Sequence, residues 1–186
     1  PGLVLPERPA AVIPNQKMIQ MAAATPDAYE AFLVKVIEIF AANGLSPILL
    51  PHASQDGALV ERVQARARVD VPVVIEHDAL NLKGIIGQCH MTMCSRFHGL
   101  VSALSQGVPT LSTGWSHKYR HLLEEYDYSE SLFDLNGELS GLEERIAAML
   151  EEGNYQRSRA KLTKKAELHR ASAEQMWSRI DQLIAN

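Results

Sequence analysis

A strand, a tight turn, a helix and a second strand follow one another between residues 90 and 112, and this order limits the fold more than any other feature. The turn carries Arg96 and His98, and the helix that opens directly behind it has small residues, Gly99 among them, on one face. Gly107 stands where a helix C-terminus favours a residue at positive φ. The stretch therefore predicts one strand–helix–strand unit with a cationic turn.

Short apolar runs alternate with segments of helical periodicity over most of the chain. Helix starts are marked by Thr25 followed by Pro26 and by Asp78, residue types that cap or begin helices. We predict strands at residues 10–14, 46–51, 71–75, 90–94, 108–112 and 131–134. This alternation indicates an α/β fold: a Rossmann-like, mostly parallel sheet with helices on both faces.

Composition restricts the class of partner and the cellular compartment. The formal net charge is −4 and the sequence pI is about 6.0, which argues against nucleic acid as a partner. No apolar run is long enough to span a bilayer, and no secretory segment opens the chain, so we expect a cytoplasmic protein. Any peripheral membrane association would involve other parts of the protein. The start at Pro1-Gly2, without Met, suggests a domain of a longer protein.

Polar side chains gather at the predicted carboxyl ends of the strands, where ligands bind in open α/β sheets. We expect the first and fourth strands to flank the switch in strand order, which puts the loop 15–17 opposite Arg96 and His98. A guanidinium, an imidazole and free helix N–H groups together form a receptor for an anion. The polar residues at the carboxyl ends of the predicted strands are Asn15, Lys17, His52, Glu76, His77, Arg96, His98, His117 and Lys118.

The sequence around this turn resembles the polysaccharide pyruvyl transferase family over most of residues 10–130. The motifs that carry the resemblance are Ser95-Arg96-Phe97-His98-Gly99, Ala103-Leu104-Ser105-Gln106-Gly107-Val108-Pro109, Lys118, and Leu49-Leu50-Pro51-His52 followed by Asp56-Gly57. Phe97 departs from the leucine that is usual in the family. The resemblance implies a two-lobed, glycosyltransferase-B-like architecture of which this chain is the C-terminal lobe, with an N-terminal lobe needed for activity.

By this resemblance, the protein forms a pyruvate ketal on a sugar of a cell-surface polysaccharide, as in exopolysaccharide biosynthesis. Phosphoenolpyruvate is the donor substrate, a glycan or lipid-linked sugar is the acceptor, and no cofactor or metal is implied. Residues 1–9 would be an entry segment, residues 10–135 a Rossmann-like donor-binding domain, and residues 136–186 C-terminal helices packing on it. The face from Met176 to Ile184 would be core or a surface for docking the other lobe.

Each candidate site residue is given a chemical role. We expect Arg96 to fork the donor carboxylate or phosphate and His98 to donate a proton or bind phosphate, which makes both catalytic candidates. Lys118 would be a point charge on phosphate. Further substrate contacts would come from Gly99 and Asn15, with His52 and His117 as secondary acid/base candidates.

Several alternatives stay open at this stage. Arg96 could instead pair with Glu76 or Asp78 and only lock the sheet, and the histidines could be ordinary loop residues. The chain could be the nucleotide-sugar lobe of a glycosyltransferase, with Glu76 or Asp78 on the ribose, or a non-catalytic anion-binding module. The spacing of Cys89, His90, Cys94 and His98 matches no zinc pattern.

Overall fold

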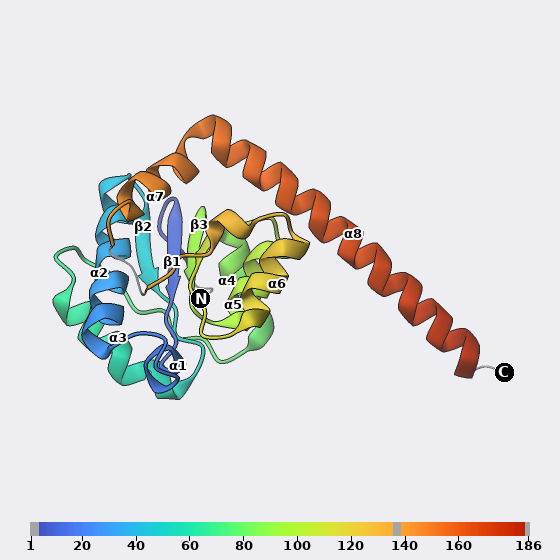
Figure 1. Ribbon diagram of the computed structural model, residues 1–186, viewed down its shortest axis with the longest axis horizontal. Helices are drawn as coiled ribbons and strands as arrows, with labels where there is room; N and C mark the ends of the chain where they lie inside the picture. Colours follow the sequence, from blue (N-terminus) through green and yellow to red (C-terminus); the bar gives the residue numbers. More distant parts are fainter. Residues whose placement is uncertain (1–3, 136–138, 185–186) are drawn as a thin grey trace.

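A computed structural model describes residues 4–135 and 139–184 and shows a parallel sheet between two layers of helices (Figure 1). The strands are β1 (Pro9–Ile13), β2 (Ser46–Leu49), β3 (Met91–Cys94) and β4 (Thr110–Ser112), in the order β2-β1-β3-β4. Val12 in β1 is in register with Leu49 on one side and Met93 on the other. The predicted Rossmann-like class and the predicted neighbourhood of the first and fourth strands are confirmed.

Two of the six predicted strands are reduced to single bridges. Val73 bridges Leu49 at one edge of the sheet, and Leu132 bridges Ser112 at the other. Pro72 accepts a bond from the Leu49 N–H but has no N–H to donate, which keeps this edge segment short. With both segments counted, the spatial order is 3-2-1-4-5-6, the order of dinucleotide-binding folds.

Side chains of β1 alternate between two apolar layers, as the pleat requires. Ala10 and Val12 join the cluster beneath α2, α3 and α7, whereas Ala11 and Ile13 join the cluster beneath α4, α5 and α6 (Figure 1). The helices are α1 (Lys17–Gln20), α2 (Pro26–Ala42), α3 (Gly57–Arg66), α4 (Ala79–Gln88), α5 (Phe97–Leu104), α6 (His117–Glu125), α7 (Leu142–Leu150) and α8 (Glu152–Ile184), with short 3-10 turns η1 (Ser54–Asp56) and η2 (Ser129–Ser131).

The predicted caps are confirmed where the sequence marked them. The Thr25 hydroxyl accepts a bond from the Ala28 N–H, and the Asp78 carboxylate accepts from Leu80 and Asn81. Gly107 has φ +69°, the left-handed conformation expected after α5. Gly153 is of a residue type that often ends a helix, but here α7 already ends at Leu150 and α8 begins before the glycine.

The long helix α8 packs on the body through its first half and then extends away from it (Figure 1). Its buried residues are Tyr155, Leu162 and Ala166. Beyond Ala166 the described residues are exposed, apart from the half-buried Ile180. The division into 1–9, 10–135 and 136–186 stays a prediction, since residues 1–3, 136–138 and 185–186 fall outside the described part. Among the described helices, none combines the length and apolarity needed to cross a membrane.

Candidate functional site

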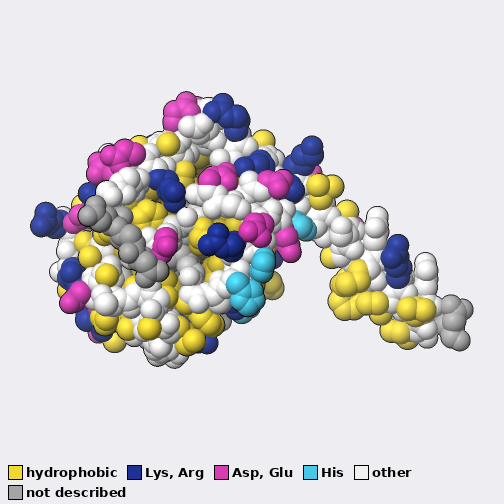
Figure 2. All heavy atoms as spheres, in the orientation of Figure 1, with side chains coloured by type: hydrophobic (Ala, Val, Ile, Leu, Met, Phe, Trp, Pro, Cys, Tyr) yellow, Lys and Arg dark blue, Asp and Glu magenta, His cyan; other side chains and the backbone are white. Residues whose placement is uncertain are grey.

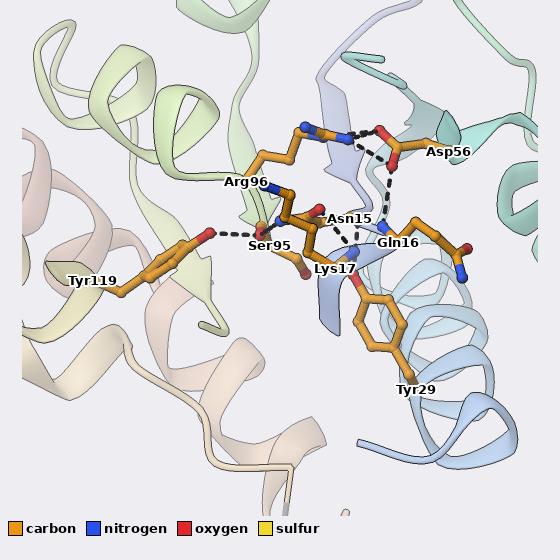
Figure 3. A network of polar contacts seen from close by, with 8 residues as sticks. All are labelled: Asn15, Gln16, Lys17, Tyr29, Asp56, Ser95, Arg96 and Tyr119. Carbon is orange, nitrogen blue, oxygen red and sulfur yellow. Dashed lines mark hydrogen bonds and ion pairs between the residues drawn. The ribbon is translucent and has the colours of Figure 1, made fainter. Parts of the chain in front are cut away.

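The loop after β1 is fixed to the turn after β3 by Asn15, which is 3% exposed. Its side-chain amide donates to the Ser95 carbonyl (2.9 Å) and its Oδ1 accepts from the Lys17 N–H (3.1 Å). Its backbone N–H donates to the Tyr29 hydroxyl (3.0 Å), and the Tyr119 hydroxyl donates to the same Ser95 carbonyl (2.9 Å). Figure 3 shows the two tyrosines on opposite sides of this contact. Asn15 therefore builds the frame of the predicted site.

The guanidinium of Arg96 is held by a carboxylate from a third strand end. Arg96 Nε and Nη2 donate to the two carboxylate oxygens of Asp56 at 2.8 and 2.7 Å (Figure 3). The Asp56 side chain is fully buried and also accepts the Gln16 N–H at 3.0 Å. One carboxylate thus ties η1, which follows β2, to the loop after β1 and the turn after β3.

Part of the Arg96 guanidinium is left for a ligand. Arginine has five N–H donors, and Asp56 takes one from Nε and one from Nη2. Among the described residues, none accepts a hydrogen bond from Nη1. The side chain is 18% exposed, so part of it is within reach of solvent. The end formed by Nη1 and Nη2 can form a second, parallel fork on a carboxylate or phosphate.

His52 stands beside this arginine, after β2. Its Cε1 lies 3.4 Å from where a Cβ on Gly99 would be, so the glycine permits the close approach of helix α5. Burial, reinforced by the positive charge of Arg96, lowers the pKa of His52 to about 4. Its Nε2 is buried and has no hydrogen-bond partner among the described residues. At neutral pH His52 is therefore an uncharged imidazole, suited to accept or share a proton.

A hollow of about 560 Å³ opens next to His52. It lies on the side away from β3, the strand that Arg96 follows. Its lining includes Ser54 at the start of η1 and Gly57 at the start of α3, together with Ile75 and Glu76 from the edge segment. The hollow gives the carboxyl edge of the sheet room for a substrate group.

The other predicted residues lie on the solvent side of the same edge. His98 is exposed in the first turn of α5. Lys118 places its Nζ 4.6 Å from the ring centroid of Phe97, so it is close to the turn. His117 is exposed at the start of α6, and its ring packs against that of His121 (5.5 Å). The structure thus brings His52, Arg96, His98 and Lys118 to one edge, while the contact of His117 is with its own helix.

The alternative prediction, that Arg96 pairs with Glu76 or Asp78, is wrong. Glu76 accepts the N–H groups of His77 and Asp78 through one oxygen and the Asn81 amide through the other. Asp78 caps α4. Both carboxylates are engaged in local structure, which weighs against their use on a ribose.

Sequence reasoning missed the ion pair of Asp56. From the sequence, this residue is only part of a family motif, although an acid after one strand facing an arginine after another is the available signal. Lys17 was noted at a strand end but given no role. Its Nζ lies 5.8 Å from the ring centroid of Trp115.

The cysteines have no place in the site chemistry. Cys89 and Cys94 are buried free thiols, and burial raises the pKa of Cys89 to about 12 and that of Cys94 to about 11. Within the part of the chain that the structure describes, no three His, Cys, Asp or Glu residues are grouped so that they could hold a metal ion.

Comparison with solved structures places the chain in a class, that of Rossmann-like lobes of glycosyltransferase-B type. The spinosyn forosaminyltransferase SpnP aligns with 98% of this chain at a TM-score of 0.61 and 18% identity. A protein from Listeria monocytogenes assigned as a UDP-N-acetylglucosamine 2-epimerase aligns with 83% at a TM-score of 0.55 and 14% identity. The chain spans 47% and 38% of these two proteins. No curated protein matches.

The family follows from the sequence. The sequence model of the polysaccharide pyruvyl transferase family matches residues 1–117, which is more than half of the chain. The chain belongs to this family. The matched region includes the predicted turn of Arg96 and His98 and all of the frame around Asn15 and Asp56 except Tyr119.

We predict that Asp56 and Arg96 are strongly coupled in stability. Replacing either by Ala leaves a desolvated charge without its partner and should lower the free energy of unfolding by about 3 kcal/mol. In a double-mutant cycle followed by urea unfolding, the coupling energy should be about 2 kcal/mol or more. The exposed pair Lys35–Glu143 (3.3 Å) is the control and should give less than about 1 kcal/mol. Equal coupling for the two pairs would contradict the prediction.

We also predict that His52 makes folding stability depend on pH. The folded pKa of about 4 lies below the ordinary 6.5, so between these values the unfolded chain binds more protons. Stability should therefore be lost as pH falls from 6.5 to 4, by on the order of 3 kcal/mol from this residue. His52→Gln should flatten the dependence in urea unfolding at several pH values. His121→Gln, at an exposed position, should leave it unchanged, and a His52→Gln profile parallel to the wild type would refute the assignment.

Proposed function

We propose that this chain is the donor-binding lobe of a pyruvyl transferase that forms a ketal on a sugar from phosphoenolpyruvate. The observation that supports it most is that Asp56 binds only one edge of the Arg96 guanidinium, through Nε and Nη2, while the side chain stays 18% exposed. A cation held in this way is pre-oriented for a small planar anion such as the donor carboxylate. Family membership supports a transferase acting on polysaccharide.

The proposed reaction balances with the donor and two acceptor hydroxyls alone. A proton adds to C3 of phosphoenolpyruvate, C2 becomes electrophilic, and one sugar hydroxyl adds there and loses its proton. The C2–O bond to phosphate then breaks, inorganic phosphate leaves, and a second hydroxyl closes the ketal and releases its proton. One of the two hydroxyl protons replaces the one taken up at C3, and the other leaves with phosphate. As written, the reaction calls for no cofactor.

The side chains at the carboxyl edge divide these tasks. The free end of Arg96 would bind the carboxylate or phosphate, with the N–H groups at the start of α5 beside it. His98, exposed in that first turn, would deliver the proton to C3 or bind phosphate. Lys118 would carry a charge to the phosphate, and the neutral His52 would accept a proton from an acceptor hydroxyl.

Transfer itself is the test. The protein with both lobes is incubated with phosphoenolpyruvate and lipid-linked or nucleotide-linked sugars, and phosphate release and product mass are followed. His98→Ala should lower kcat by about 10²–10⁴, whereas His121→Ala, on the exposed face of α6, should not. Arg96→Lys should weaken donor binding about tenfold, because an ammonium cannot keep both forks.

Two results would count against this function. Calorimetric titration that shows a nucleotide bound and phosphoenolpyruvate not bound would favour a nucleotide-sugar glycosyltransferase. Unchanged donor binding in Arg96→Lys would remove Arg96 from the site.

A second lobe would contact the exposed half of α8. The two solved structures are more than twice as long as this chain. The alignment with the forosaminyltransferase covers 98% of this chain and therefore includes most of α8. Met176, Ile180 and Leu183 recur at four and three residues along one side of the helix, and large apolar side chains gather there (Figure 2). An apolar stripe of this kind is typical of an interaction surface, and a second lobe is the occupant that we propose.

We predict that a charge on this stripe breaks lobe contact without unfolding the chain. Met176→Glu combined with Leu183→Glu should leave the thermal unfolding of this chain unchanged, since both positions are exposed. In the protein with both lobes, the pair should lower activity at least tenfold. Ser178→Glu, at an exposed position of the same helix, is the matched control. Self-association of the chain that the double variant abolishes would instead assign the stripe to a second copy.

A further inference from the structure

Two lysines from different loops converge on one tryptophan ring. Lys17 begins α1, after β1, and its Nζ lies 5.8 Å from the ring centroid of Trp115. Lys118 lies in the first turn of α6, after β4, and its Nζ lies 5.7 Å from the same centroid. The two ammonium groups are therefore no farther apart than the sum of these two distances, although the lysines are far apart in the sequence.

Among the residues that the structure describes, neither ammonium group has an acidic partner. Several other cations are paired with carboxylates, as Arg62 and Arg66 are with Glu30, and Lys165 is with Asp127. Among the described residues, no carboxylate lies within 4.0 Å of Lys17 or Lys118. The Trp115 ring attracts both cations through its face, and this attraction offsets their mutual repulsion in water. The result is a pair of like charges held together and left uncompensated.

The position of this pair relative to the sheet gives it a ligand class. The strand order puts β3 between β1 and β4, so the two lysines flank the turn of Arg96 and the start of α5. No side chain caps the N-terminus of α5, which leaves its first N–H groups for an anion. Lysine binds phosphate as a compact point charge. Two lysines and a helix N-terminus together match a dianionic phosphoryl group.

Space for the rest of such a ligand adjoins the ring. A hollow of about 310 Å³ is lined by Met18, Gly114, Trp115, Arg120 and Asp134, among others. Arg120 adds a third cation on this side, and Asp134 adds one carboxylate. A group esterified to the phosphoryl would fit here without displacing the lysines.

We propose that Lys17 is a second phosphoryl-binding lysine, which acts as a pair with Lys118, and that Trp115 is the positioning residue that holds both ammonium groups. The proposal rests on the proposed function for the biological source of the phosphoryl group, the donor or the acceptor's phosphate. The site itself is defined by the two lysines, the ring and the N-terminus of α5.

Trp115 can report on the site directly. The chain has two tryptophans, and Trp177 is exposed on the distal part of α8. In a Trp177→Phe background, the fluorescence of Trp115 is titrated with phosphoenolpyruvate, pyrophosphate and inorganic phosphate at constant ionic strength. Saturable changes are expected, because anion binding moves the ammonium groups relative to the ring. Phosphoenolpyruvate represents the donor, and pyrophosphate represents the phosphate of a carrier-linked acceptor. Comparing the binding of these two ligands therefore distinguishes the two sources of the phosphoryl group.

Variants in the same background identify the lysines. Lys17→Ala and Lys118→Ala should each weaken binding about tenfold, the loss expected for one charge-assisted contact, and Lys17→Arg should retain most of it. Lys83→Ala, at an exposed position of α4, is the matched control. Trp115→Phe, followed by calorimetry, should weaken the same ligands and leave thermal unfolding near that of the wild type, which separates positioning from a role in stability.

The outcomes divide cleanly. If Lys17→Ala binds every ligand as Lys83→Ala does, the assignment of Lys17 is overturned. If phosphoenolpyruvate does not bind but pyrophosphate binds and depends on Lys17, the phosphoryl site stands and the donor named in the proposed function is wrong. If phosphoenolpyruvate binds and depends on Lys17, the pair belongs to the donor.

Discussion

The ion pair between Asp56 and Arg96 is the contact on which the arrangement of the carboxyl edge depends. A buried carboxylate is costly unless its oxygens accept hydrogen bonds. Asp56 accepts two from the guanidinium of Arg96 and one from the backbone N–H of Gln16. These partners come from the segments that follow β1 and β3. The loops cannot move independently without exposing an uncompensated charge, so the site is rigid where it meets the sheet.

Rigidity of this kind decides what Arg96 can do. A free arginine on a loop would lose side-chain entropy when it binds a ligand, whereas this one has already been ordered by Asp56. The side-chain entropy of Arg96 is lost on folding and not on binding, and the free end of its guanidinium is held in a fixed plane. His52, kept neutral by burial next to that cation, supplies the complementary property of an uncharged nitrogen at the same edge.

The sequence predicted those features that depend on neighbours along the chain. Apolar alternation located the four strands, and local capping chemistry at Thr25, Asp78 and Gly107 located the helix ends. Segments 71–75 and 131–134 were predicted as strands but form single bridges at the two edges of the sheet, because edge pairing depends on tertiary geometry and Pro72 interrupts the first of them. Gly153 lies inside α8 although glycine often ends helices, because the Glu151 carboxylate caps the start of α8 by accepting from the Gly153 and Asn154 N–H groups. The Asp56–Arg96 pair joins residues 40 positions apart, and no local pattern encodes such a contact.

Polar groups at this edge fall into two sets, and the contrast between them supports the proposed ligand position. Asn15, Ser95, Tyr29 and Tyr119 are buried and bonded to one another, so they serve the frame. The described part of the chain has three buried side-chain polar atoms without a partner, and two of them, His52 Nε2 and Ser116 Oγ, belong to loops at the carboxyl edge. Native structures rarely leave such atoms unpaired, because each costs free energy. Together with the Arg96 Nη1 group and the two lysines near Trp115, they are polar groups for which the described residues supply no acceptor or acidic partner, and a bound anionic substrate is the partner that we propose for them.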